Sequence, residues 1–286
     1  MKKRKIILTI LLVLLVSVFG ISTFFVIRDV YRSKTEDAAN RELSSVVNDL
    51  KDDTRRHRSR NDGTDETEGE TGNGEEDEDP YTEDGILKYL APIYEQNSDL
   101  AGWLTIPGTT IDYPVMYTPE YIQKYLRMAF NGEWALSGSL FLGEGWSEDN
   151  NYAIIYGHHM QDGSMFCNLV DYESLEFAKE HPIVEFDTLR EMGDYDVMCA
   201  CLTQVTGDPS AFHYYEYTDL RDPEIFAEFF EGVGTEALYF TDVRAEYGDG
   251  ILILSTCNYH TDNGRFYLVA VMKAESPEAP TEESSS

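Results

Sequence analysis

Positive charge is scarce over most of this 286-residue sequence. Residues 80–275 contain 9 Lys and Arg against 33 Asp and Glu, and the whole chain carries a net charge of −31. A surface this acidic repels phosphate groups, so nucleic acid is excluded as a partner. The same field raises the pKa of a thiol or an imidazole, so a reactive cysteine here needs a cation close by.

Cysteine is also scarce, with four in the chain. Cys199 and Cys201 lie two positions apart in a strand-like run, which puts both thiols on one face. Two small buried hydrophobes fit that pattern better than a metal-binding or redox pair, and we expect Cys167 to be packed as well. The sequence has no set of four ligands at the spacing of a zinc site. We therefore expect neither a metal nor an organic cofactor.

Hydrophobic side chains are absent from residues 62–79, which contain 10 acidic residues and no base. A segment of this composition buries too little apolar surface to fold, and its charges repel one another. The sequence thus predicts a disordered linker at this position. The end of the chain, residues 275–286, has a similar composition and is expected to be a disordered tail.

One long hydrophobic run is present: residues 6–27 are 22 consecutive uncharged residues rich in Leu, Ile, Val and Phe. As a helix, this run is long enough to cross the hydrocarbon core of a bilayer. Four bases precede it within residues 1–5, which predicts a cytoplasmic N-terminus and an extracellular remainder. The alternative is a cleaved signal peptide with its site near Gly20-Ile21-Ser22. Because the apolar run continues through residues 24–27, an uncleaved, single-pass anchor in the cell membrane is favoured.

The remaining chain divides into a stalk and linker at 28–79 and a folded domain at 80–274. Short apolar runs separated by turn residues predict a mainly β domain with inserted helices, and a β-barrel is favoured, although periodicity alone does not separate a barrel from a sandwich. Two short strands are expected around a Pro-Gly turn within 100–115, followed by strands at 139–142, 153–156, 183–186, 195–205, 250–255 and 266–272. Helical segments are expected at 28–50, 85–94, 120–128, 166–172, 175–180 and 223–231.

Three chemically distinctive side chains follow or begin strand-like runs. The run at 252–256 leads into Cys257, Arg265 opens the next run eight residues later, and the run at 152–156 ends in Gly157-His158-His159. A thiol, an imidazole and a guanidinium are the groups that cysteine-based acyl transfer requires. An imidazole can protonate a leaving amine, and a permanent cation can stabilise an oxyanion.

These residues carry a resemblance to a known family. Leu254-Ser255-Thr256-Cys257 with Arg265 resembles the Leu-x-Thr-Cys…Arg signature of sortases. The segment 155–166, around His158, is similar to the histidine motif of class B sortases. The strand pair at 102–115 and the helix at 223–231 are also similar to features of that class. The resemblance covers residues 81–273, and it implies an eight-stranded β-barrel on the outer face of a Gram-positive membrane.

The resemblance also implies an activity and a role for each residue. A sortase cleaves a secreted protein after the Thr of a C-terminal sorting motif through a thioester, and transfers that protein to an amine of a cell-wall precursor or a pilin. Cys257 matches the nucleophile, His158 the acid and base, and Arg265 the residue that binds the oxyanion or the substrate. Ser255 matches a position that contacts the bound motif.

The sequence departs from the family pattern at two positions. His159 stands where relatives often have Asn, and His158 is preferred because it follows Gly157 directly, as the motif requires. A neighbour on a strand would also point to the other face. Gly143 stands where many relatives have Asp, which leaves open whether Glu144 or Asp149 supports the histidine.

Two other functions fit parts of the pattern. In a papain-like extracellular cysteine peptidase the cysteine precedes the histidine and opens a helix, whereas here His158 comes first and Cys257 ends a strand. A catalytically silent, anchored binding module is the alternative outside enzymes. The presence of all three groups argues against it.

Overall fold

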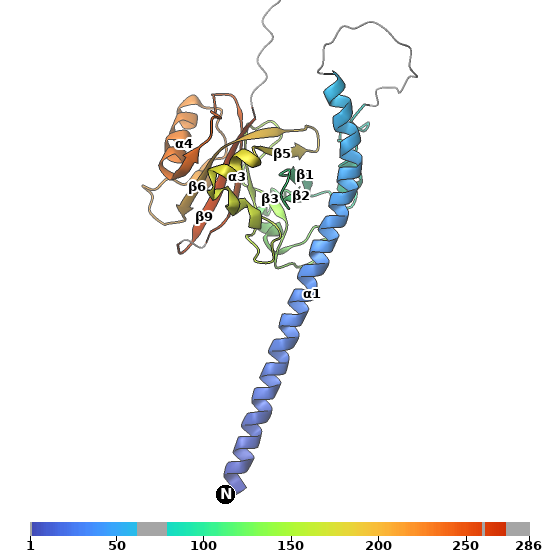
Figure 1. Cartoon of the computed structure of the whole chain (residues 1–286), viewed down its shortest axis with the longest axis vertical. Helices are drawn as coiled ribbons and strands as arrows, with labels where there is room; N and C mark the ends of the chain where they lie inside the picture. The colour runs from blue at the N-terminus through green and yellow to red at the C-terminus, as the bar shows by residue number, and fades with distance from the viewer. Residues whose placement is uncertain (1, 62–78, 259–260, 273–286) are drawn as a thin grey trace, which may run out of the picture.

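The computed structural model describes residues 2–61, 79–258 and 261–272 (Figure 1). The first of these segments is one continuous helix, α1 (Lys2–Asn61). Its stretch Thr9–Arg28 is long and apolar enough to cross a membrane. The acidic linker expected at 62–79 lies outside the described residues apart from Asp79, as does the tail expected at 275–286.

The folded domain is a closed β-barrel. Its strands pair in the order β5-β1-β2-β3-β4-β8-β9-β6, and a further pairing between β5 and β6 closes the circle of eight. A ninth strand, β7, extends the sheet at the other end of the long strand β6. Closure decides between the two architectures that periodicity left open and confirms the barrel. The strands are β1 (Leu100–Thr105), β2 (Asp112–Met116), β3 (Leu140–Leu142), β4 (Tyr152–Tyr156), β5 (Ile183–Thr188), β6 (Asp194–Gln204), β7 (Ala237–Phe240), β8 (Gly250–Cys257) and β9 (Gly264–Met272).

Helical segments lie in the connections between strands. They are α2 (Ala91–Tyr94), η1 (Ile122–Arg127), η2 (Cys167–Glu173), α3 (Leu175–Glu180), η3 (Tyr214–Glu216) and α4 (Pro223–Glu236). The helix α4 begins where the sequence predicts, because the Asp222 carboxylate accepts hydrogen bonds from the backbone N–H groups of Glu224 and Ile225, and Pro223 occupies the first turn.

The helix expected at 85–94 is wrong over most of its length. Gly85 has a positive φ of 73° and lies in a turn, and Pro92 fits a helix only within its first turn. Helical geometry therefore forms only at α2. The segments expected at 120–128 and 166–172 form 3-10 helices, η1 and η2, and the short strand β7 is not among the predicted strands.

The strand β8 is buried on both faces. Leu252 and Leu254 point into the barrel, where they join a core built from all of its strands. Ile251 and Ile253 point outwards and pack with Phe229 of α4 in a second core. This alternation, with a period of two, fixes the face on which each later residue of β8 lies.

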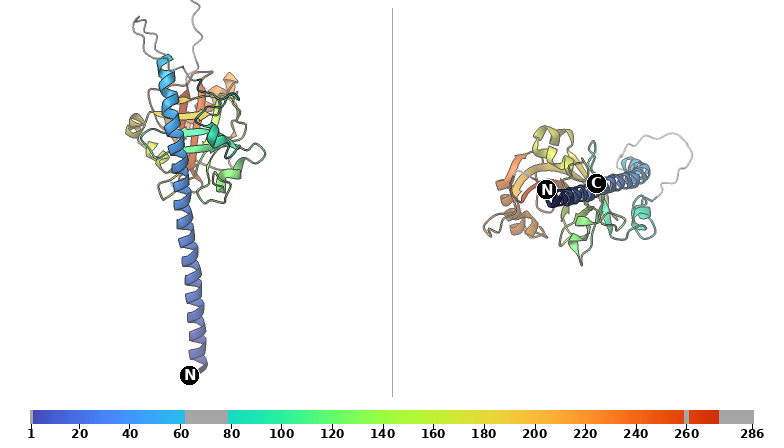
Figure 2. Two further views of the ribbon diagram at one scale, coloured as in Figure 1. Left: turned by 90° about the vertical axis from the view of Figure 1, so that its right-hand side faces the viewer. Right: turned by 90° about the horizontal axis from the view of Figure 1, so that it is seen from below.

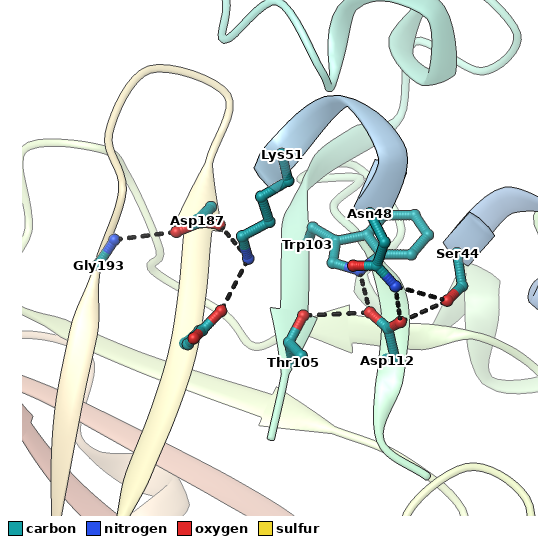
Figure 3. A network of polar contacts seen from close by, with 9 residues as sticks. Ser44, Asn48, Lys51, Trp103, Thr105, Asp112, Asp187 and Gly193 are labelled. Atoms are coloured by element: carbon teal, nitrogen blue, oxygen red, sulfur yellow. Dashed lines mark hydrogen bonds and ion pairs between the residues drawn. The ribbon is translucent and has the colours of Figure 1, made fainter. Parts of the chain in front are cut away.

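The C-terminal third of α1 packs against the outside of the barrel, where Val47 is fully buried in a third core. Ser44 and Asn48 donate hydrogen bonds to the Asp112 carboxylate (Figure 3). Nζ of Lys51 lies 2.6 Å from Asp187 and 2.9 Å from Glu185, and Lys51 and Asp187 are both buried. The two further views show α1 running along the barrel and then beyond it towards the N-terminus (Figure 2). Part of the stalk expected at 28–79 thus belongs structurally to the folded domain.

Candidate active site

Cys257 lies at the end of β8 on its outward face. It shares the parity of Ile251, Ile253 and Ser255, so its thiol projects on the side of the sheet that α4 covers. The side chain is partly exposed. A thiol in this position is accessible to a substrate, whereas Cys199 and Cys201 are not, because both are fully buried with their sulfurs 3.9 Å apart, as predicted.

Arg265 is held beside Cys257 by the antiparallel pairing of β8 and β9. The two residues are direct partners in this ladder, and such partners project their side chains from the same face about 4.5–5.5 Å apart at Cβ. On its other side Arg265 pairs with Thr203 of β6. The register of the sheet thus places a permanent positive charge next to the thiol.

The end of β4 is fastened to the end of β8. The N–H of Gly157 donates to the carbonyl of Ser255 at 3.1 Å, and the Thr256 hydroxyl donates to the carbonyl of Gly157 at 2.9 Å. The two strands run parallel, so both end on the same side of the barrel. This attachment brings His158, which follows Gly157, to the same edge as Cys257.

Gly157→Ala is expected to destabilise the domain by about 1–3 kcal/mol, the usual cost of overpacking a core. A Cβ at this position would lie 2.5 Å from Leu140 Cδ2 and 2.6 Å from Phe166 Cδ2, and both side chains are fully buried. Chemical denaturation of the full chain in detergent measures the loss. Gly207→Ala is the matched control because a Cβ there meets nothing within 4 Å, and an equal effect of the two substitutions would contradict the argument.

His158 is held in one tautomer by the connection between β2 and β3. Its Nε2 lies 2.9 Å from the carbonyl oxygen of Leu126, at the end of η1. A carbonyl only accepts, so Nε2 carries the proton and Nδ1 of the neutral ring has a free lone pair. Burial lowers the pKa of His158, the hydrogen bond to Leu126 opposes that change, and the Arg127 guanidinium lowers the pKa further. The ring is therefore neutral and available as a base near neutral pH.

We expect the NMR titration midpoint of His158 to lie below 6.5, and to rise in Arg127→Gln because a nearby positive charge is removed. A group with a lowered pKa in the folded state contributes stability that is complete above its unfolded pKa. That contribution is lost as the pH falls through the folded pKa. Lys124→Gln is the control, since Lys124 pairs with Asp99 at 2.6 Å. A midpoint unchanged by Arg127→Gln would exclude the proposed effect of this cation.

The four residues singled out in the sequence line one cavity of about 480 Å³. Cys257, His158 and Arg265 reach it from the ends of three different strands. Ser255 is 1% exposed, and its hydroxyl lies 2.7 Å from the Tyr214 hydroxyl, so it is engaged within the protein. The other lining residues are Ile122, Gln123, Leu126, Phe141, Glu144, Tyr156, Gly157, Val205, Tyr214, Tyr215 and Thr256.

Eleven lining residues were not identified as site residues from the sequence, and three of them bear on the chemistry of the cavity. Tyr156 shares the outward face of the sheet with Cys257, and burial raises its pKa to about 12 against the opposing effect of Arg265, so it stays protonated. Strand alternation was a usable signal for this residue. Tyr215 belongs to the aromatic segment 212–217, and Leu126 acts through its backbone carbonyl, which no side-chain motif reveals.

The structure also shows which of the groups that the sequence places near His158 share its cavity. Glu144 lines the same cavity as His158, whereas Asp149 lines a separate one of about 530 Å³. His159 lies beyond the end of β4 at Tyr156 and pairs with Met165 in an isolated β-bridge. Its Nδ1 lies 3.3 Å from the carbonyl oxygen of Cys257. Among the described residues that line the cavity, His158 is present and His159 is not.

The four cysteines are all free thiols. Cys167 is partly exposed, so it is less packed than expected, and burial together with nearby Asp171 and Asp162 raises its pKa. Among the described residues, no group of three or more His, Cys, Asp and Glu side chains is arranged to hold a metal ion.

Comparisons with known proteins agree with this architecture. No family model matches the chain. Sortase B of Listeria monocytogenes is 32% identical over 177 residues, which cover 60% of this chain and 68% of that protein. Sortase B of Staphylococcus aureus is 29% identical over 191 residues, which cover 64% of this chain and 75% of that protein.

Solved structures give the same result. A Staphylococcus aureus sortase B–substrate complex superposes with a TM-score of 0.66 at 25% identity, covering 86% of this chain and 100% of that one. A Bacillus anthracis protein described as similar to sortase B gives a TM-score of 0.58 at 30% identity, covering 67% of this chain and 86% of that one.

A closed eight-stranded barrel with a thiol, an imidazole and a guanidinium at one edge defines a sortase-type enzyme fold. This chain belongs to the sortase B family, a family of cell-wall transpeptidases.

Proposed function

We propose that this protein cleaves a C-terminal sorting motif after Thr and transfers the cleaved protein to an amine of the cell wall or of a pilin subunit. The observation that supports this best is the meeting of Cys257, His158 and Arg265 in one cavity. We further propose that α1 anchors the enzyme in the membrane, with its N-terminus in the cytoplasm and residues 80–274 outside as the catalytic domain.

The first half of the proposed reaction forms a thioester. The Cys257 thiol gives its proton to the neutral His158 ring, and the thiolate attacks the carbonyl carbon of the motif's Thr. Arg265 stabilises the negative charge that develops on the carbonyl oxygen. As the peptide C–N bond breaks, His158 returns the proton to the departing amine, and the acyl group remains on sulfur.

The second half of the reaction resolves the thioester. An acceptor amine attacks the same carbonyl carbon and gives a proton to His158, the C–S bond breaks, and the Cys257 thiol is restored. A new amide bond replaces the one that was broken. Water as the acceptor gives hydrolysis instead, which is the activity of the alternative function, an extracellular cysteine peptidase.

Mass spectrometry of the full chain in detergent tests this proposal. The protein is incubated with pooled sorting-motif peptides and, in parallel, with triglycine or diaminopimelate-type amines. A thioester on Cys257 that resolves into an amine-linked product is the expected result, and Cys257→Ala gives neither species. Hydrolysis without an amine-linked product would indicate a peptidase. Peptide binding without any adduct, at a Cys257 that still reacts with iodoacetamide, would indicate a silent binding module.

The charge of the domain leads to a prediction for the second step. The acceptor amine is cationic, and residues 80–275 carry 33 acidic and 9 basic side chains. Electrostatic steering should therefore accelerate aminolysis, and the rate should fall as salt rises because charges are screened over about 10 Å at 0.1 M. Single-turnover aminolysis of the preformed thioester measures this effect. A neutral hydroxylamine acceptor is the control, and an identical salt dependence for both acceptors would reject steering.

A further inference from the structure

Four large apolar side chains are exposed in the connection between β2 and β3: Tyr121, Leu126, Trp134 and Leu136. Trp134 is 51% exposed and Leu136 is 47% exposed, while Ala135 between them is fully buried. This alternation means that Trp134 and Leu136 project from the same side of an extended segment. We call Trp134 and Leu136 the β2–β3 patch.

The patch is held on an ordered framework. Trp134 pairs with Met128 in an isolated β-bridge, the N–H of Ala135 donates to the carbonyl of Arg127 at 3.0 Å, and the Arg127 guanidinium donates to the carbonyl of Leu136. From the same connection, Tyr125 and Phe130 are buried in the core. The domain thus buries part of this connection and fixes the patch on its surface.

The patch lies beside α1, close to where its apolar stretch ends. Trp134 and neighbouring residues line a cavity of about 240 Å³ together with residues 35–43 of α1, and the Ser137 hydroxyl donates to the Glu36 carboxylate at 2.8 Å. The apolar stretch of α1 ends at Arg28. Thr35 lies seven positions after Arg28 in the helix, which corresponds to about 10 Å at 1.5 Å per residue.

A distance of about 10 Å from the end of the apolar stretch brings the β2–β3 patch within reach of the membrane interface. The headgroup zone extends roughly 5–8 Å beyond the hydrocarbon core on each side, and a helix tilt of about 20° is usual. The remaining gap is comparable to the length of a Trp side chain. In Figures 1 and 2 the green loops between β2 and β3 lie at the end of the domain that faces the N-terminal half of α1.

Charge favours the same contact. The connection 117–139 contains Glu120, Glu133, Lys124 and Arg127 and so has no net charge, within a domain that is otherwise strongly acidic. An anionic membrane surface repels acidic regions, so a neutral apolar region is the part of the domain suited to approach it. Trp is also the side chain enriched at membrane interfaces.

We propose that the β2–β3 patch rests in the headgroup region of the outer leaflet, as a second membrane contact beside α1. The inference rests on the proposed anchoring of α1. Leu126, in the same connection, lines the catalytic cavity and holds His158 through its carbonyl. In this arrangement the catalytic cavity lies close to the membrane surface.

Quenching of tryptophan fluorescence by brominated lipid tests the contact. The full chain is placed in nanodiscs of phosphatidylcholine and phosphatidylglycerol, with or without bromine near the top of the acyl chains. The lipid is expected to quench the wild-type protein, and Trp134→Phe is expected to lose most of that quenching. Trp103 is buried and remains as an internal reference.

The matched control moves the indole to the opposite end of the barrel. Tyr247 is 57% exposed and precedes β8 at the end away from Cys257, so Trp134→Phe combined with Tyr247→Trp should show no added quenching. Equal quenching of the wild type and Trp134→Phe would overturn the proposal. The proposal would also be overturned if the lipid did not quench the protein and sedimentation in detergent showed a dimer that Leu136→Glu abolishes. The patch would then be a contact between two copies of the chain. No substrate is involved, so failure of the transpeptidase proposal leaves this measurement unaffected.

Discussion

Arg265→Met is expected to lower kcat/KM for cleavage of a sorting peptide by roughly 100- to 1000-fold, the usual cost of removing one oxyanion donor. Arg265 is the direct cross-strand partner of Cys257, and it is the single Lys or Arg among the described residues that line the cavity. Its loss removes the cation that offsets the acidic field of the domain. Initial rates with the peptide identified by mass spectrometry measure the effect.

Arg265→Lys serves as the conservative variant. It keeps the charge but not the planar, forked guanidinium, so only part of the activity should return. Alkylation of Cys257 by iodoacetamide in each variant shows that the cavity is still formed. A fall in kcat/KM of less than about tenfold in Arg265→Met would contradict an oxyanion role, since such donors contribute more than this.

Lys51→Met is expected to destabilise the docked state of α1 and the barrel by about 3–5 kcal/mol. The Lys51 side chain is 5% exposed and pairs with Asp187, which is 0% exposed, so the substitution removes a cation 2.6 Å from a buried carboxylate. Chemical denaturation of the full chain in detergent, followed by tryptophan fluorescence, measures the change. Trp103 reports on this region because its indole donates to Asp112, which also binds Ser44 and Asn48 of α1 (Figure 3).

Two further variants test whether the loss of stability comes from the burial of the Lys51–Asp187 pair or from the removal of any ion pair. Asp187→Asn combined with Lys51→Met should recover part of the loss, since an amide still accepts from the N–H of Gly193 without an uncompensated charge. Arg221→Met removes an exposed ion pair with Asp219 and should cost less than about 1 kcal/mol. Similar losses in Lys51→Met and Arg221→Met would show that burial of the pair is unimportant.

The strand order of the barrel was not available from the sequence alone. Apolar runs predicted eight of the nine strands, because alternation and turn residues are local signals. Their pairing depends on contacts between distant segments, such as the parallel alignment of β4 with β8, and no local pattern specifies it. The pattern of short strands favoured a barrel without excluding a sandwich, and the resemblance carried by residues 254–257 and Arg265 implied a barrel. The pairing of β5 with β6 confirms it.

In the candidate site, too, local sequence motifs were identifiable, whereas contacts between distant segments were not. Cys257, His158 and Arg265 were identifiable because each stands at the end or start of an apolar run in a recognisable motif, and the structure gathers them in one cavity. The Leu126 carbonyl was not identifiable, since every residue has such a group and only the fold selects one. The contact of His159 Nδ1 with the Cys257 carbonyl was likewise not identifiable, because it depends on how the ends of β4 and β8 meet in the fold.

The packing of α1 was missed for a related reason. From the sequence, residues 28–79 were assigned to a stalk and linker, with a helix expected over residues 28–50. The helix makes its contact through Val47 and Leu43, which join the third core, and through several polar side chains. These include Glu36, Ser44, Asn48 and Lys51. Buried polar contacts depend on their partners on the barrel, so a single segment gives no sign of them.

The attachment of α1 has a practical consequence for any soluble version of the enzyme. A fragment that starts at residue 80 would remove the cover from Trp103 and leave Asp187 buried without Lys51. It would also remove the contacts of Lys51 with Glu185 and Asp187 of β5, the strand whose pairing with β6 over Ile183–Glu185 closes the barrel. A fragment that starts near residue 31 omits the apolar stretch but keeps these contacts. Kinetic constants compared between the two fragments would show how far the choice of N-terminus shapes the measured activity.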